Sequence, residues 1–213
     1  MITSYDRSYW IGGSDTKYVI AKNKSTVTWR RWWNIKMGID DSMFAGNIYT
    51  RMGTVYEHPI LKAIDENINL DRQLIIPKYN LRVNYDGDLD GVIYEVKTHR
   101  ADTEIQFHPG SAYYNQCQVE MFCWKQYLKE SKVYCDYHIR EHIPELKACY
   151  IVDYPLMVDE YNMLEKYEDG APVAIDKDRI KFHKIKYDKG FISLYKPELK
   201  RLAKAIRGDG IPW

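Results

Sequence analysis

Acidic and basic side chains gather in one short stretch of the sequence, NYDGDLDGVIYEVKTHR at positions 84–100. The pair Asp90-Gly91 between apolar residues predicts a hairpin with a two-residue type I′ turn. With that turn, Asp86 and Glu95 are expected to face each other across two strands, and Lys97 shares the face of Glu95. Opposed carboxylates repel each other, so the pattern predicts a divalent cation held by hard oxygen ligands.

Two other interpretations of this stretch remain open. Asp90 is an alternative metal-binding aspartate, although it lies five residues before Glu95, and an odd offset along a strand places side chains on opposite faces. Charges beside an Asp-Gly turn are also commonly solvated and serve no site. The strand at 92–97 favours a site, because it is otherwise apolar and yet carries an acid and a base on one face.

Helices on both sides of the hairpin carry further polar side chains. A helix over 44–64 is expected to place Glu57 beside an apolar row, with Gly53 one turn earlier. Helical side chains lean toward the N-terminus, so a glycine at that position leaves the space above Glu57 open. A later helix over 112–128 carries Gln116 along one side.

The whole chain is expected to fold as one domain, 1–213. The other expected elements are helices over 15–22, 27–37, 156–167 and 191–206, and strands over 81–87, 92–98, 133–139, 148–152 and 180–187. In the first of these helices, Ser14 is expected to be the N-cap. This order of elements predicts an α/β or α+β fold with a mixed central sheet flanked by helices.

The 213 residues carry a formal net charge of only +1, but the charges are unevenly distributed. Basic stretches lie at 22–36 and 181–207, and patches of this kind attract polyanions even when the total is near zero. Three tryptophans at helical spacing in 27–37 are expected to be core residues. Arg30 and Arg31 lie off that stripe, where they could contact phosphate.

Four cysteines include no C-x-x-C pair, and they are expected to be free core thiols in a reducing cytoplasm. Their spacing disfavours an iron–sulfur cluster, and the histidines show no zinc spacing. The N-terminal segment lacks the pattern of a secretion signal, and no apolar run approaches the length of a membrane span. We therefore expect a cytoplasmic protein without a membrane partner.

Four segments resemble, in the same order, the motifs of the phage lambda exonuclease family, or YqaJ viral recombinase family, of the PD-(D/E)XK nuclease superfamily. They are RSYWIGGSD at 7–15, MGTVYE at 52–57, VNYDG and YEVKT within 83–98, and SAYYNQCQVEMF at 111–122. One departure is Tyr85, which precedes Asp86 where many family members have proline. The resemblance implies a restriction-endonuclease-like PD-(D/E)XK fold.

The resemblance also implies a metal site. Asp86, Glu95 and the carbonyl oxygen of Val96 would hold Mg²⁺, with Mn²⁺ as an alternative and one or two ions in each site. Glu57 would help to hold a second ion or its waters. Hard oxygen ligands of this kind suit Mg²⁺ and its bound water.

Further roles follow from the same resemblance. Lys97 would orient or activate the attacking water, and Gln116 would help to position it. Arg7, Ser14 and Asn84 match positions that the family uses for the 5′-phosphate of the DNA.

The implied activity is that of a Mg²⁺-dependent 5′→3′ exonuclease that enters at the ends of double-stranded DNA and leaves a 3′ overhang. The implied partners are a single-strand annealing protein and two further copies of the chain in a ring-shaped homotrimer, within the cytoplasm of a bacterial or phage-infected cell. Two alternatives are a structure-specific or restriction-type endonuclease of the same superfamily and a catalytically silent DNA-binding protein.

Overall fold

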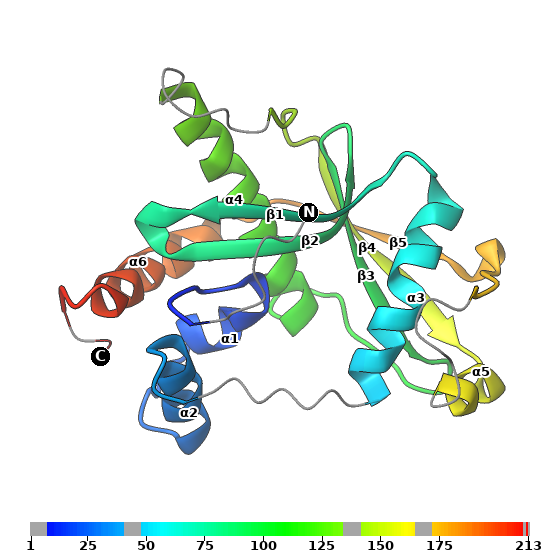
Figure 1. The fold of residues 1–213 in the computed structure, drawn as a ribbon, viewed down its shortest axis with the longest axis horizontal. Coiled ribbons are helices and arrows are strands. Elements are labelled where there is room, and N and C mark those ends of the chain that lie inside the picture. Colours follow the sequence, from blue (N-terminus) through cyan, green and yellow to red (C-terminus); the bar gives the residue numbers. More distant parts are fainter. Residues whose placement is uncertain (1–7, 41–47, 134–141, 165–171, 211, 213) are drawn as a thin grey trace.

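A mixed sheet of five strands, in the order β1-β2-β3-β4-β5, forms the centre of the computed structural model (Figure 1). The described residues are 8–40, 48–133, 142–164, 172–210 and 212. The strands are β1 (Asn69–Ile76), β2 (Leu81–Leu89), β3 (Val92–Arg100), β4 (Ala148–Leu156) and β5 (Lys181–Ile185). Strands β3 and β4 pair in parallel, and the other neighbours pair antiparallel. The predicted mixed α/β fold is therefore confirmed.

Helices cover both faces of this sheet (Figure 1). They are α1 (Thr16–Val19), α2 (Val27–Lys36), α3 (Ile48–Ile64), α4 (Ala112–Val133), α5 (Val158–Met163) and α6 (Lys189–Ile206). Helices α4 and α6 pack on the face that carries Ile93 and Ile151, whereas α3 packs on the face that carries Val96 and Val152. Adjacent residues of one strand thus contribute to two separate cores, as the alternation of side chains along a strand requires.

The Asp90-Gly91 hairpin forms as predicted. Both turn residues have positive φ, 48° at Asp90 and 85° at Gly91. A side chain at Gly91 would place its Cβ 2.1 Å from the carbonyl oxygen of Glu145, so only glycine fits there. Backbone pairing joins Leu89 to Val92 and Gly87 to Tyr94.

The next expected pair, Asp86 with Glu95, does not form. Antiparallel pairing between β2 and β3 ends at Gly87. Beyond it, β2 continues beside β1, and β3 continues beside β4 in a different direction (Figure 1). The sheet therefore opens into a fork at Asp86.

Several sequence-based expectations need correction. Ser14 is not an N-cap: it lies in a 3-10 turn, η1 (Gly13–Asp15), and the helix that follows ends at Val19. Strand β1 was not predicted, because its first half, NLDR, is polar. The strand expected at 133–139 is wrong at Val133, which ends α4, and 134–139 lie outside the described residues.

Two further helix boundaries differ from the expectation. The helix expected at 156–167 begins later, at Val158, because Leu156 still pairs in β4 with Arg100. The first part of the helix expected at 44–64 lies outside the described residues, and α3 begins at Ile48.

The tryptophans of α2 are core residues, as predicted. Trp29, Trp32 and Trp33 are all buried, with the ring centroids of Trp29 and Trp33 stacked at 5.6 Å. Thr26 caps the helix by accepting a hydrogen bond from the backbone N–H of Trp29. The indole N–H of Trp32 donates to the buried carboxylate of Asp15 at 2.8 Å, which ties α2 to the N-terminal loop.

Candidate active site

The fork between β2 and β3 positions the first carboxylate of the candidate site. Because the strands separate there, the backbone N–H of Val96 has no β2 carbonyl to pair with. It donates instead to Oδ2 of Asp86, at 2.8 Å. Asp90 is exposed in the turn at the far end of the hairpin. Of the two aspartates considered, Asp86 is therefore the one held beside the Glu-x-Lys strand.

Two more predicted side chains, Lys97 and Gln116, meet at Glu95 on the face that α4 covers. Nζ of Lys97 forms an ion pair with Oε1 of Glu95. The amide of Gln116 donates to the same oxygen at 2.6 Å. Glu95 is 1% exposed, and its other oxygen, Oε2, is buried with no hydrogen-bond partner among the described residues. An unpartnered carboxylate oxygen is costly to bury, so this atom requires a cation or a water that the protein does not itself provide.

Gln116 rather than Gln118 belongs to the site. The side chain of Gln118 is fully buried and bridges the backbone just before α6, donating to the carbonyl of Lys186 at 2.8 Å and accepting from the N–H of Asp188 at 2.7 Å. Gln116 and Gln118, two residues apart on α4, therefore have different structural roles. One contacts Glu95, and the other anchors a helix.

Glu57 approaches the same cluster from α3. Burial, and after it the nearby negative charge of Glu95, together raise the pKa of its carboxyl to about 7. A Cβ added to Gly53 would meet no atom within 4 Å, so the space one turn before Glu57 is open, as predicted. A ligand can reach the carboxyl from that side.

The charges of the cluster do not balance. Burial raises the pKa of Asp86 well above its ordinary range, and the neighbouring carboxylates of Glu95 and Glu57 add to that effect. Burial by itself lowers the pKa of Lys97, but the attraction of Glu95 and Asp86 outweighs it and the pKa is raised overall. One ammonium group therefore faces four carboxyl groups, those of Glu57, Asp86, Glu95 and Glu120, and a divalent cation would correct this excess of acidic groups.

The residues fit such an ion. The donors at the fork are carboxylate oxygens, which Mg²⁺ and Mn²⁺ prefer. Asp86 and Glu95 face the fork from its two sides, and one oxygen of Glu95 is unpartnered. This unpartnered oxygen is the feature that a bound cation would explain.

The N-terminal Gly-Gly-Ser-Asp loop lies beside the cluster. A Cβ at Gly13 would come within 3.4 Å of Oε1 of Glu120 and 3.5 Å of the Gln116 side chain, so the loop abuts α4 at the level of the site. Ser14 in this loop is exposed. Asp15 has a structural role, since it accepts from the N–H of Gly12 and forms an ion pair with Lys36 at 2.7 Å.

The described residues that were predicted to contact DNA are not part of the carboxylate cluster. Asn84 is exposed on β2, two residues before Asp86, and its oxygen accepts from the amide of Gln73 at 2.8 Å. Arg30 and Arg31 are exposed on α2, and neither contacts the carboxylate cluster within the part of the chain that the structure describes. Arg7 lies outside the described residues.

Sequence reasoning missed three acidic groups near the site. Asp71 lies in β1 between the paired residues Leu70 and Arg72, with a positive φ of 54°, and its carboxylate lies 3.2 Å from Nε2 of His58, which is next to Glu57. Glu120 is fully buried one turn after Gln116, with both oxygens unpartnered among the described residues. The helical spacing of Glu120 from Gln116 was a usable signal, whereas nothing in the sequence marked Asp71.

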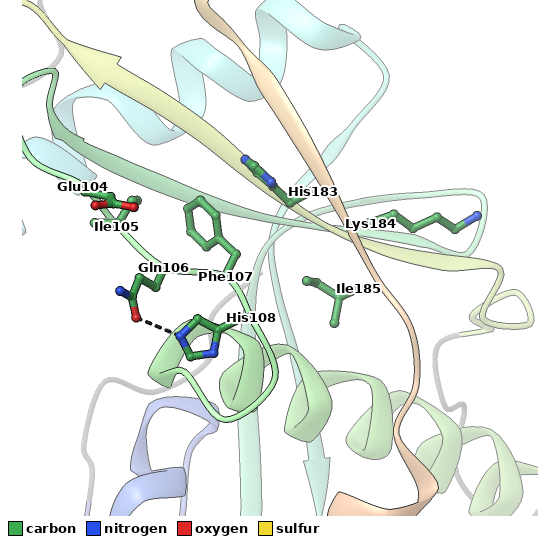
Figure 2. Close-up of a pocket in the computed structure, with 8 residues that line it drawn as sticks. All are labelled: Glu104, Ile105, Gln106, Phe107, His108, His183, Lys184 and Ile185. Atoms are coloured by element: carbon green, nitrogen blue, oxygen red, sulfur yellow. Dashed lines mark hydrogen bonds between the residues drawn. The ribbon is translucent and has the colours of Figure 1, made fainter.

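A third missed group, Asp153, lies on the far side of Lys97. Asp153 pairs in register with Lys97 across β3 and β4, so the two side chains share a face. Its carboxylate lies 2.8 Å from Nε2 of His99 and 3.5 Å from Nε2 of His183. A surface hollow of about 570 Å³ opens beside His183 and Phe107 (Figure 2).

Comparison with solved structures identifies the class of fold. The alkaline exonuclease LHK-Exo of Laribacter hongkongensis superposes with a TM-score of 0.62 at 16% identity, over 95% of this chain and 90% of that one. A phage-related exonuclease of Haemophilus somnus superposes with a TM-score of 0.57 at 16% identity, over 92% of each chain. The chain therefore has the fold of these exonucleases.

A second structure of LHK-Exo, in complex with dAMP, superposes with a TM-score of 0.61 over the same shares of the two chains. No protein-family model and no curated protein matches the sequence. No helix among the described residues is long and apolar enough to cross a membrane.

Proposed function

We propose that this chain is a metal-dependent nuclease that degrades double-stranded DNA from its ends. The observation that carries the proposal is the cluster at the fork, where Asp86 is fixed to Val96 and the buried Glu95 has one oxygen without a partner. The fold of two exonucleases supports it. The same cluster in a DNA-binding scaffold would be a pure cost, because buried and unbalanced carboxylates destabilise a fold.

In this proposal, Asp86, Glu95 and the Val96 carbonyl hold Mg²⁺, or Mn²⁺ in its place, and Glu57 holds a second ion or its waters. When bound, the metal lowers the pKa of a water molecule and neutralises charge on the scissile phosphate. The chain's own groups do the rest. Lys97 directs its ammonium toward the attacking hydroxide and the phosphate, and Gln116 keeps the Glu95 carboxylate in place.

The protonation of Lys97 favours this orienting role. Its raised pKa makes the side chain a cation in the metal-free protein. In that state the side chain can position anions and stabilise negative charge, because a cation cannot accept a proton from water. The pKa of Glu57, raised to about 7, brings the titration of this carboxyl close to neutral pH in the metal-free protein.

We propose further a direction of digestion and a protein partner. Digestion runs 5′→3′ and leaves a 3′ overhang for a single-strand annealing protein, with the 5′-phosphate held near Ser14, Asn84 and Arg7. Three copies of the chain form a ring around the DNA. A duplex labelled at the 5′ end of one strand, and a second labelled at the 3′ end, test the direction: the 5′ label is expected to appear first as mononucleotide.

The proposed ring-shaped homotrimer is tested independently of DNA cleavage. Mass photometry of the purified chain is expected to show a trimer as the main species. A monomer would remove the ring from the proposal and leave the chemistry at the fork unaffected. A 3′ label released first would reverse the direction and remove the roles given to Ser14 and Asn84.

A further inference from the structure

A row of rings leads away from Lys97 across the face of the sheet. Nζ of Lys97 lies 5.0 Å from the ring centroid of Tyr113. The Tyr113 ring lies 6.2 Å from Phe107, and Phe107 lies 4.5 Å from His183. We call Tyr113, Phe107 and His183 the ring shelf. Successive ring contacts thus run from Lys97 in the candidate site to His183 on β5.

The shelf borders an open hollow. Figure 2 shows Phe107 and His183 beside each other, with Gln106 and His108 on the loop below them and Lys184 on the strand. The rings of Phe107 and His183 are tilted by 40°, so they do not close into a tight stack. Both side chains are only partly buried, which leaves ring surface for a ligand.

The β5 end of the shelf lies beside a buried carboxylate. Asp153 is 7% exposed and lies between the imidazoles of His99 and His183. The other nitrogen of the His99 ring is 2.8 Å from the carbonyl oxygen of Arg100, so that ring is held on both sides. A carboxylate is expensive to bury unless its partners are well placed, so this arrangement is preorganised and not a chance feature of the surface.

The chemistry of the shelf suits a flat, polar ligand attached to an anion. Every nucleobase offers a π face for stacking on aromatic rings, and an imidazole N–H at the edge can donate a hydrogen bond to an adjoining phosphate. The lining of the hollow includes His108, His183 and one acid, Glu104, whereas the Lys184 side chain points away from it, toward Tyr150 (Figure 2). The volume of about 570 Å³ is ample for one base.

We propose that the ring shelf receives an unpaired base of the DNA strand that is being cut, next to the scissile phosphate. The proposal rests on the proposed nuclease function. Asn84 lies on β2, on one side of Lys97, and the shelf lies toward β5, on the other. The shelf therefore holds the base on the side of the scissile phosphate away from the 5′-terminal phosphate, and it keeps the strand unstacked at the point of cleavage.

A binding measurement tests the shelf without cleavage. The probe is a short 5′-phosphorylated duplex with 2-aminopurine as the second nucleotide, mixed with the protein in Ca²⁺ to restrain hydrolysis. Stacking on a protein ring quenches 2-aminopurine fluorescence once the base leaves the helix. With wild-type protein the emission is expected to stay low, because the base passes from the stack of the helix to the ring shelf. Phe107→Leu and His183→Ala leave the unpaired base unstacked, so they are expected to raise the emission severalfold. The leucine keeps the apolar volume, so folding is maintained.

Phe182→Ala is the matched control. Phe182 is on the same strand as His183 but points to the other face, where its ring packs against Tyr150 at 6.0 Å. This variant is expected to keep the emission as low as wild type does. Equal responses from wild type, Phe107→Leu and His183→Ala would overturn the proposal.

A cleavage measurement separates the shelf from the nuclease proposal. Linear duplexes with and without an abasic second nucleotide are digested by each variant in Mg²⁺. Loss of the base is expected to slow wild type and Phe182→Ala roughly tenfold and to leave Phe107→Leu unaffected, because one stacking contact is worth about that factor. Equal sensitivity in all variants would contradict the shelf. No cleavage by any variant would contradict the nuclease proposal instead, and the fluorescence result would stand alone.

Discussion

Oδ2 of Asp86 accepts a hydrogen bond from the backbone N–H of Val96 at 2.8 Å, in the place where the antiparallel ladder would otherwise continue. The side chain thereby occupies the gap that the separating strands leave open. It also fixes one carboxylate oxygen at the strand that carries Glu95 and Lys97, which leaves Oδ1 for a ligand. The fork in the sheet and the proposed metal site are thus one structural feature.

The variant Asp86→Asn is expected to keep this hydrogen bond, because the amide oxygen can still accept from Val96. It loses the negative charge, so Mg²⁺-dependent cleavage should fall by more than about a hundredfold, since even indirect partners of metal ligands contribute 10- to 100-fold. Thermal stability in EDTA should stay equal or rise, because repulsion from Glu95 and Glu57 is relieved. Asp90→Asn is the control and should cleave like wild type. Loss of cleavage in Asp90→Asn alone would show that Asp90, and not Asp86, is the metal-binding aspartate.

Gln116 and Gln118 form a second matched pair. Gln116→Ala should lower cleavage by about 10- to 100-fold with little change in stability, because it frees Glu95 to move. Gln118→Ala should lower the free energy of unfolding by about 1 to 3 kcal/mol for each backbone group left without a partner, with cleavage per folded molecule retained. Steady-state kinetics and denaturant melts on both variants provide the comparison. The reverse pattern would move the site by two residues along α4.

Removal of the Lys97 side chain should separate binding from chemistry. Lys97→Ala is expected to reduce turnover by more than about a hundredfold, in the range found for positioned catalytic groups, while Mg²⁺ still binds. The metal-induced shift in melting temperature, measured beside Lys200→Ala on the exposed side of α6, reports the binding. Turnover at the level of the control would remove Lys97 from the mechanism.

The raised acid pKa values predict how stability depends on pH. Burial raises the pKa of Glu57 from its usual 4.5 to about 7, and that of Asp86 is raised as well. The folded metal-free protein then binds more protons than the unfolded chain. The stability from this source is fully present at low pH, and it is lost as the pH rises through about 7.

Melting temperatures in EDTA should therefore fall as the pH rises from about 4.5 to about 7, and Mg²⁺ should restore more stability at the higher pH. Glu57→Gln should flatten part of this slope. A Mg²⁺ effect of equal size at both pH values would contradict the proposed cluster.

The hairpin and the tryptophan helix show what local patterns determine. The Asp90-Gly91 turn requires positive φ at two successive residues, and few sequences supply it. The three tryptophans at helical spacing lie on one face of the helix, and that face is expected to be buried. Both features were predicted because the cause lies within a few residues of the chain.

The fork and the groups around it show what local patterns leave undetermined. Asp86 and Glu95 do not pair because β2 stays paired with β1 beyond the point where it separates from β3. Strand β1 begins with polar residues, so its sequence does not predict a strand. Asp153 comes beside Lys97 through the parallel register of β3 and β4, a pairing across more than fifty positions. Such groups depend on sheet topology, which the spacing of residues in one segment does not report.

The most direct test of the central claim is a competition between two DNA forms in Mg²⁺. An equimolar mixture of 5′-phosphorylated linear duplex and covalently closed circular duplex is incubated with the chain, with Glu95→Ala and EDTA as controls, and both forms are followed by gel. The account predicts loss of the linear form alone, with mononucleotides and one surviving strand, and no loss in either control. Nicking of the circle, or loss of the linear form with Glu95→Ala, would contradict it.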